Sequence, residues 1–189
     1  MINIEIQGDV KQVAGTLSGL GIGLQKTAIT RAINRAIDST TTRANRAIRE
    51  RYNLSRAAVA KALRVTKASA AQDVPAATIV ASGRRISIFE FGGRATKRGA
   101  ITVLIRKDRG RETVRGRANM GGKPFVQTIS GPRAVWQRTG KGRFPVKQVK
   151  GPSIPYMFVR SAIRKAMEET ATEVFTKNLG QQIRFLGGR

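Results

Sequence analysis

The sequence predicts an α+β fold, in which a long N-terminal helix and a C-terminal helix pack on a small antiparallel sheet with extended basic loops and an arm. Two helical stripes of apolar residues, over 24–52 and 155–186, enclose a middle region of short alternating strands. The 189 residues suit a single domain. We divide it into a helical region (24–67), a β-rich region (76–139), an extended arm (140–155) and the C-terminal helix.

The first residues carry the pattern of a short strand. Ile2, Ile4 and Ile6 alternate with polar neighbours, and a period of two is typical of a strand. Asp9 is placed to cap a short helix that ends near Leu20, although the glycines in this stretch lower its helix propensity. We therefore expect a strand and a weak helix before the first long helix.

The strongest helical pattern covers residues 24–52. Its apolar residues recur at helical spacing and form one face: Ile29, Ile33, Ile37, Ala44 and Ile48. Arginines fall on the opposite face: Arg31, Arg35, Arg46 and Arg49. The polar run 39–42 lowers the helix propensity and predicts a kink in the middle of the helix.

Residues 55–74 allow two interpretations. Ser55 can cap a helix over 56–63, and the residues up to Val74 would then supply the reading helix of a helix-turn-helix. The alternative is that two short amphipathic elements pack on the rest of the protein. We favour packing, because Arg64 stands where a turn glycine is common and Pro75 shortens the second helix.

The middle of the chain predicts two hairpins and one further strand. Residues 77–80 and 86–91 flank a turn-forming stretch and are expected to pair. Residues 125–129 and 134–138 form the second predicted hairpin, and residues 101–105 form the remaining strand. The strands are short, so we expect a small sheet.

Two basic segments with interspersed glycines have no apolar period. Residues 107–123 are predicted to form a mobile loop. Residues 140–155 are predicted to form an extended arm, because they contain too few apolar residues to fold on themselves. Pro155 then suits the first turn of the C-terminal helix. The residues of that helix expected in the core, against the long-helix stripe or the sheet, are Val159, Ile163, Ala166, Met167 and Val174.

The charge balance limits the classes of function. Thirty-six Lys and Arg stand against eleven Asp and Glu, for a formal net charge of +25, and there is no His or Cys. Without an imidazole or a thiolate, and with scattered acids, we expect no enzymatic activity, no metal site and no cofactor. No apolar run approaches the roughly 20 residues that span a bilayer, so we expect no membrane partner.

A field this positive predicts a surface for polyanions. Ten basic residues are candidates for contact with phosphates or, with equal weight, with acidic proteins: Arg84, Arg85, Arg94, Lys97, Arg98, Lys107, Arg109, Arg111, Arg115 and Arg117. Aromatic residues are not interleaved with them, so stacking on single-stranded bases is not indicated. Trp136 fits an anchor in the core or an interface better than a stacking residue. The candidate subunit-interface residues are Trp136, Arg143, Phe144, Pro145, Pro152 and Pro155.

Two segments resemble one known family. The first is Ala32-Ile33-Asn34-Arg35-Ala36, in an arginine-bearing helix that ends in Arg51-Tyr52-Asn53-Leu54 and is followed by residues 61–67. The second is residues 125–157, in which an FVQ strand precedes AVWQRTGKGRFPVKQVKGPSIPYM. Together they resemble the minor tail protein Z family of long-tailed bacteriophages.

The resemblance implies a structural virion protein for tail completion and head–tail joining, at the head-proximal end of the tail or the neck, without enzymatic activity or a cofactor. It implies assembly in the host cytoplasm beside other tail or neck proteins. With the predicted arm, it leads us to expect a ring of copies with sixfold or threefold symmetry. The basic surface adds virion DNA as a candidate partner. Two alternatives stay open: a sequence-indifferent nucleic-acid-binding protein similar to ribosomal proteins, and a helix-turn-helix regulator that uses residues 57–74.

Overall fold

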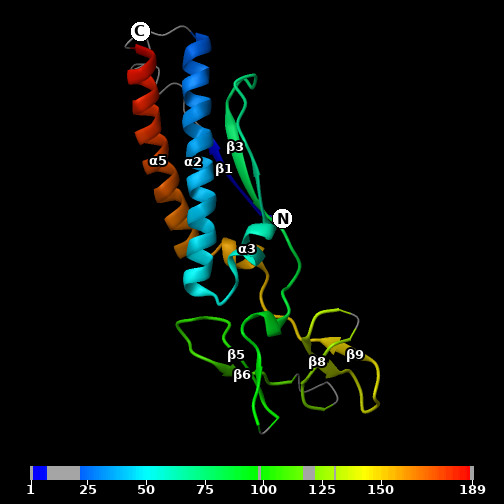
Figure 1. Cartoon of the computed structure of the whole chain (residues 1–189). Coiled ribbons are helices and arrows are strands. Elements are labelled where there is room, and N and C mark those ends of the chain that lie inside the picture. Colours follow the sequence, from blue (N-terminus) through cyan, green and yellow to red (C-terminus); the bar gives the residue numbers. More distant parts are fainter. Residues whose placement is uncertain (1, 8–21, 98, 117–121, 130, 188–189) are drawn as a thin grey trace.

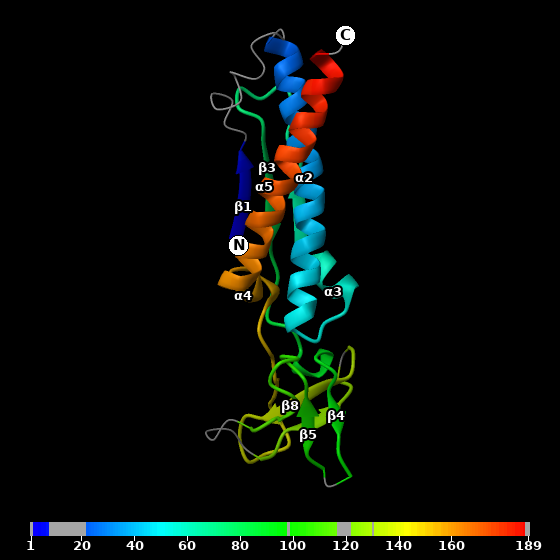
Figure 2. The same ribbon diagram turned by 90° about the vertical axis from the view of Figure 1, so that its left-hand side faces the viewer.

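The structure is a computed structural model that describes residues 2–7, 22–97, 99–116, 122–129 and 131–187. Figures 1 and 2 show an elongated molecule with two long helices and a sheet at one end and two smaller sheets at the other. The short helix predicted over 9–20 lies outside the described residues. Within the described part, no helix is both long and apolar enough to cross a bilayer.

Two antiparallel helices form the long axis of the molecule. Helices α2 (Ile22–Arg51) and α5 (Ser161–Gly187) run side by side in both views. The isoleucine stripe of α2 shares one buried cluster with Ile163 and Met167 of α5. The α+β class and the long helix are thus confirmed. The polar run does not end α2, and the hydroxyls of Thr41 and Thr42 find acceptors one turn earlier in the helix.

The C-terminal helix is interrupted, which corrects a prediction. Its first turn is a separate helix, α4 (Ile154–Phe158), and α5 begins only at Ser161. Helix α4 buries Ile154, Met157 and Phe158 in the core cluster. Because Met157 and Phe158 fill the core at this point, Val159, which was predicted to be buried, is 44% exposed. At its other end, α5 continues to Gly187, close to the end predicted at 186.

One antiparallel sheet packs against the helices. Its strand order is β1 (Ile2–Gln7), β3 (Ala76–Ala81) and β2 (Leu63–Thr66). Strand β3 alternates, with Ala77, Ile79 and Ala81 buried in the same cluster as α2. The predicted N-terminal strand is therefore confirmed, and it pairs with a strand about seventy residues further along, Ile4 opposite Ile79.

The helix-turn-helix interpretation is wrong. Ser55 caps α3 (Arg56–Ala62) by accepting a hydrogen bond from the Ala58 amide at 3.1 Å, but the chain then forms β2 instead of a second helix. Along β2, Leu63 and Val65 alternate with exposed polar residues, and the strand pairs with β3, Val65 opposite Ile79. Asn34 of α2 fixes the next residues through two hydrogen bonds to the Ala68 backbone. The region 24–67 is accordingly helical only as far as Ala62.

The first predicted hairpin does not form either. Strand β3 uses both of its edges for β1 and β2, so no edge is left for residues 86–91. Those residues leave the sheet and form a short 3₁₀ turn, η1 (Ile88–Glu90), before the fully buried Phe91. Ser87 pairs with Lys150 through an isolated bridge instead.

Two small antiparallel sheets make up the far end of the molecule. The first orders β4 (Arg94–Ala95), β5 (Ile101–Val103) and β6 (Glu112–Thr113). The second orders β7 (Phe125–Gln127), β8 (Ala134–Arg138) and β9 (Val146–Gln148). The strand at 101–105 and the hairpin of 125–129 with 134–138 are confirmed in shorter form. Strand β6 lies inside the predicted loop 107–123, whose mobility stays a prediction.

The predicted arm pairs with its own body. Strand β9 continues the β7–β8 sheet, with Val146 opposite Arg138 and the Thr139 amide donating to the Pro145 carbonyl at 3.0 Å. The Gly151 amide then donates to the Ile86 carbonyl at 2.8 Å. The prediction considered only apolar side chains, but the free edge of β8 offers backbone hydrogen bonds that need none. A free arm over 140–155 is therefore incorrect.

Candidate docking surface

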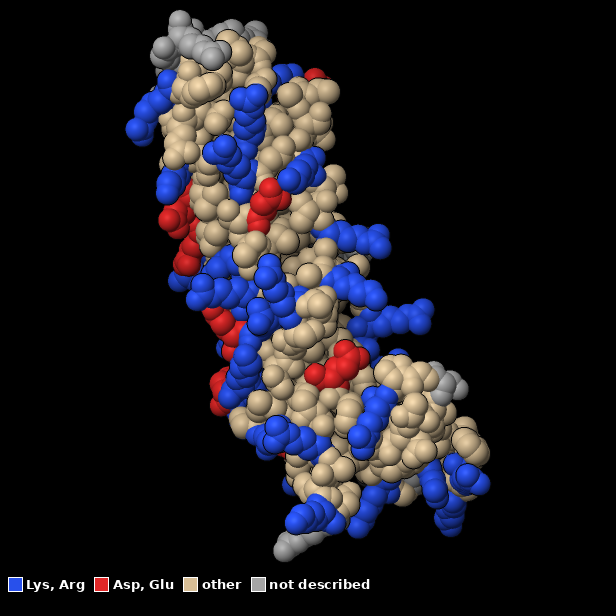
Figure 3. All heavy atoms as spheres, in the orientation of Figure 1, with Lys and Arg blue, Asp and Glu red and all other residues tan. Residues whose placement is uncertain are grey.

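Basic side chains cover the molecule from end to end. Figure 3 shows them projecting from both the helical and the β-rich parts, with the acidic side chains fewer. Some acids are held by neighbouring cations on α2 and in the β-rich part. Arg43 and Arg46 donate to Glu50 at 3.2 and 2.9 Å, and the hydrogen bond from Arg43 is the main cause that lowers the pKa of this carboxyl. Hydrogen bonding from Arg106 likewise lowers the pKa of Asp108. With 36 cations against 11 acids, most of the positive charge remains unbalanced.

The eight described members of the ten predicted contact residues do not converge on one site. The side chains of Arg84, Arg94, Lys97, Lys107, Arg109 and Arg115 are exposed. They come from the connection after β3, from β4 and its turn, and from the segments on either side of β6. Arg98 and Arg117 lie outside the described residues. The described members therefore form a spread basic surface, which suits a long polyanion or a large acidic partner better than a small anion.

Two of the ten have structural partners. The Arg111 guanidinium donates to the carbonyls of Gly92 at 2.6 Å and Thr102 at 3.1 Å, so it joins β5 to the turn after η1. The Arg85 guanidinium donates to the carbonyls of Gly151 at 3.1 Å and Lys150 at 3.3 Å. It thereby ties the two chain segments that connect the helical and β-rich parts. Both side chains remain cationic, but their donors are partly used by the fold.

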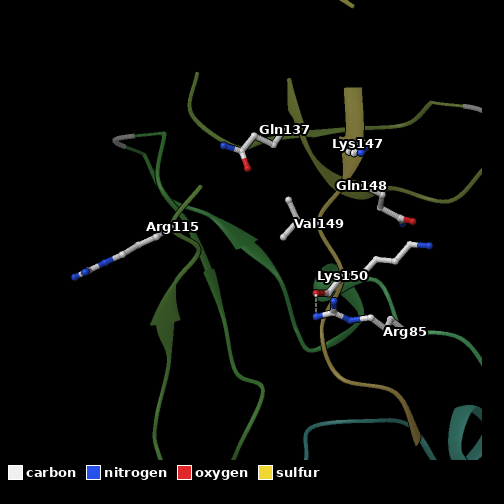
Figure 4. Close-up of a pocket in the computed structure, with 7 residues that line it drawn as sticks. All are labelled: Arg85, Arg115, Gln137, Lys147, Gln148, Val149 and Lys150. Carbon is white, nitrogen blue, oxygen red and sulfur yellow. Dashed lines mark hydrogen bonds between the residues drawn. The ribbon is translucent and has the colours of Figure 1, made fainter. Parts of the chain in front are cut away.

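A basic pocket lies beside β8 and β9. It has a volume of about 340 Å³, and four cations line it: Arg85, Arg115, Lys147 and Lys150. Figure 4 shows the Arg115 guanidinium pointing away from the two lysines, so the cations surround the pocket without meeting at its centre. Gln137, also in the lining, is buried and donates to the Gly122 carbonyl at 3.2 Å. This arrangement attracts negative charge without defining one small ligand.

Lys147 and Lys150 were missed as candidates. The sequence shows them only as two of six basic residues between 133 and 150. The structure places them near Arg85 because β9 adds to β8 and the next residues bridge to Ser87. These two lysines could not be assigned to the site without knowing that β9 pairs with β8, and the local sequence carries no signal for that pairing.

The six candidate interface residues occupy separate places. Phe144 is 66% exposed at the turn between β8 and β9, with the Arg143 guanidinium 5.9 Å from its ring centroid and Pro145 exposed beside it. Trp136 is half-buried in β8, and its indole N–H donates to the Gln127 carbonyl at 2.9 Å. Pro152 and Pro155 lie next to and within α4. The turn with Phe144 therefore presents its side chains to solvent, whereas Trp136 is held within its own sheet.

Among the described residues, no group of three or more His, Cys, Asp or Glu side chains is arranged to hold a metal ion. The profile of the family described as prophage minor tail protein Z matches residues 10–186, which is nearly the whole chain. No curated protein and no solved structure gives a significant match.

Proposed function

Because the chain belongs to the prophage minor tail protein Z family, we propose that it completes the phage tail at its head-proximal end and takes part in joining the tail to the head. As a minor tail protein, it is a virion component that interacts with other tail proteins. The family match over residues 10–186 carries this proposal. The proposed role is structural and not enzymatic. The lack of His and Cys supports this, because it removes the side chains that most often move protons or attack carbonyls near neutral pH.

We further propose that several copies form a ring with sixfold or threefold symmetry in the tail end or neck. A ring needs two different surfaces that meet between neighbours. Strands β1 and β2 lie at the two edges of their sheet, and unpaired strand edges are a common means of pairing with another chain. The exposed turn with Phe144 offers a second contact, in place of the arm that the sequence predicted.

A reconstruction of the particle tests the ring. We expect density for the described fold at the head-proximal end of the tail, repeated three or six times around the axis with neighbours in contact. A single isolated copy per particle, or copies at the distal end of the tail, would contradict the proposal.

The exposed basic residues of the β-rich part are proposed to contact virion DNA through its phosphates. Residues 66–74, the candidate reading helix, run from the end of strand β2 (Leu63–Thr66) into turns and bends, so this described segment gives no rigid helix to read bases. The alternative function, a sequence-indifferent nucleic-acid-binding protein of another kind, makes the same prediction for DNA. It differs in requiring co-sedimentation with ribosomes or other folded RNA instead of recovery in purified virions.

Salt titrations test the binding of DNA phosphates. Neutralising Arg84, Arg94 and Lys97 to Gln is expected to reduce the slope of log affinity against log salt by about 0.9 for each phosphate that the variant no longer neutralises. The folded state should be unaffected, because exposed charges contribute little to stability. The matched control neutralises three exposed cations of the helical part, Arg31, Lys177 and Arg184, and should leave the slope unchanged. Equal effects from both triple variants would rule out a localised DNA-binding surface. A strong preference between two unrelated duplexes would instead support a regulator.

A further inference from the structure

We propose that a groove beside α4 docks an acidic segment, bearing apolar side chains, from another protein. The α4 groove lies where the helical part meets the β-rich part and has a volume of about 530 Å³. Ile88, Ile105, Pro152 and Tyr156 supply its apolar lining, and Arg85 and Lys150 supply its cations. The inference concerns the chemistry of this surface and does not depend on where the chain lies in the particle.

The apolar lining continues onto exposed residues that the fold does not bury. Helix α4 already buries Ile154, Met157 and Phe158 in the core. Tyr156 is nevertheless 50% exposed and Val159, three residues further on, is 44% exposed. Val159 directly follows the last residue of α4, and its amide still donates to the Pro155 carbonyl at 3.4 Å, so it keeps near-helical spacing from Tyr156. The two exposed side chains form one apolar patch, of which Tyr156 lines the groove. Contiguous exposed apolar surface of this kind marks an interaction site more often than an isolated exposed residue does.

The surroundings of the patch are cationic. Arg160 lies over the Tyr156 ring, with its guanidinium carbon 4.1 Å from the ring centroid. The basic pocket beside β8 and β9 shares Arg85 and Lys150 with the groove and adds Arg115 and Lys147. Of the described residues that line the groove and this pocket, none is acidic. An apolar groove with a cationic surround is complementary to a segment that combines carboxylates with apolar side chains.

Part of the cationic surround is fixed before any partner arrives. The Arg85 guanidinium is held by the carbonyls of Gly151 and Lys150 at 3.1 and 3.3 Å. A side chain that is already ordered loses little conformational entropy when it meets a carboxylate. The groove thus presents an oriented positive charge next to an apolar surface.

Two other occupants of the groove can be considered, a second copy of the chain and DNA. Charge and chemistry distinguish the acidic protein segment from both. A second copy of the chain has 36 Lys and Arg against 11 Asp and Glu, so it offers few carboxylates to this cationic surface, and the ring contacts proposed above use the sheet edges and the Phe144 turn instead. The DNA backbone offers negative charge but no apolar side chain to cover Ile88 and Ile105. One face of the Tyr156 ring is already covered by Arg160, which leaves that face unavailable for a stacked base. An acidic protein segment with apolar side chains supplies both carboxylates for the cations and apolar contacts for the groove lining.

Anisotropy titrations of the full chain with a labelled synthetic peptide test the proposal. The probe is a short peptide rich in Glu with a central Phe-Leu-Phe, and there are two matched control peptides. In one control Gln replaces every Glu, and in the other Ser replaces the apolar triplet. The probe should bind at least about tenfold more tightly than either control, because the groove uses charge and apolar contact together. If the probe does not bind, or binds no better than the controls, the proposal is overturned.

Four single variants locate the binding. Val159→Ser and Lys150→Gln are each expected to weaken probe binding by about tenfold. The controls are Phe144→Ser and Lys141→Gln, which likewise replace one apolar and one cationic side chain. Both side chains are exposed at the turn between β8 and β9. They should leave probe affinity unchanged, and thermal unfolding should be similar for all four. Equal weakening in the controls would show nonspecific binding and overturn the proposal. Loss of duplex DNA binding in Val159→Ser, with probe binding retained, would assign the groove to nucleic acid and overturn it as well.

Discussion

An Ile163→Asp variant is expected to lose at least about 3 kcal/mol of unfolding free energy. Ile163 is 1% exposed and belongs to the cluster that joins α5 to the isoleucine stripe of α2. A carboxylate at this position loses its hydration among apolar neighbours. It either remains charged at a large desolvation cost or takes up a proton, and in both cases the packing of the isoleucine side chain is removed. Because α2 and α5 form the long axis of the molecule, we expect cooperative unfolding of the helical part.

The same substitution at Val159 is the matched control. Both residues belong to the apolar stripe that the sequence predicts, but Val159 is 44% exposed at the break between α4 and α5. Val159→Asp should therefore change the unfolding free energy by no more than about 0.5 kcal/mol. Urea denaturation followed by circular dichroism measures both variants. If Ile163→Asp were as stable as Val159→Asp, the burial of Ile163 between α5 and α2 would be contradicted.

The long-range pairing of β3 was beyond what the sequence pattern could predict. Residues 77–80 and 86–91 have the alternation of paired strands and a turn-forming stretch between them, so a local hairpin was the simplest solution. Strand β3 instead pairs with β1 and β2, which lie outside that stretch of sequence. Alternation shows that a strand has a buried face but does not name its partner. The apolar stripe of α2 is visible in the local sequence alone, so this helix was predicted almost to its ends.

The C-terminal stripe shows a related difficulty. Val159 and Ile163 are four residues apart, which is the spacing of one helical face. The sequence gives no clear signal that the helix is interrupted at 159–160. The break follows from the burial of Met157 and Phe158 against the core, a tertiary effect that overrides local periodicity.

The roles of the basic residues were predictable only as a group. Arg84 and Arg111 look alike in sequence, since each lies in a basic segment near glycine. Only the fold shows that the Arg111 guanidinium, although exposed like that of Arg84, donates to the carbonyls of Gly92 and Thr102. The α4 groove had no sequence signal at all, because Ile88, Ile105 and Tyr156 come from three separate segments.

Removing the chain from the particle is expected to have the largest functional effect. In the proposed role, the chain is added after the tube is built and before the head arrives. Tails assembled without this chain should therefore form but fail to join heads. The defect should be nearly complete, because a missing terminal component leaves no alternative surface for the head to bind. Deleting an early tail component would instead prevent tails from forming.

An in vitro assay that joins tails to heads measures the proposed tail-completion role most directly. Tails assembled without the chain are mixed with filled heads, with or without the purified protein, and infectious particles are counted. We predict that infectivity stays at the level of heads alone without the protein and is restored by wild-type protein but not by Ile163→Asp. If tails that lack the chain joined heads as efficiently as complete tails, or if no tails formed in its absence, the role in tail completion would be contradicted.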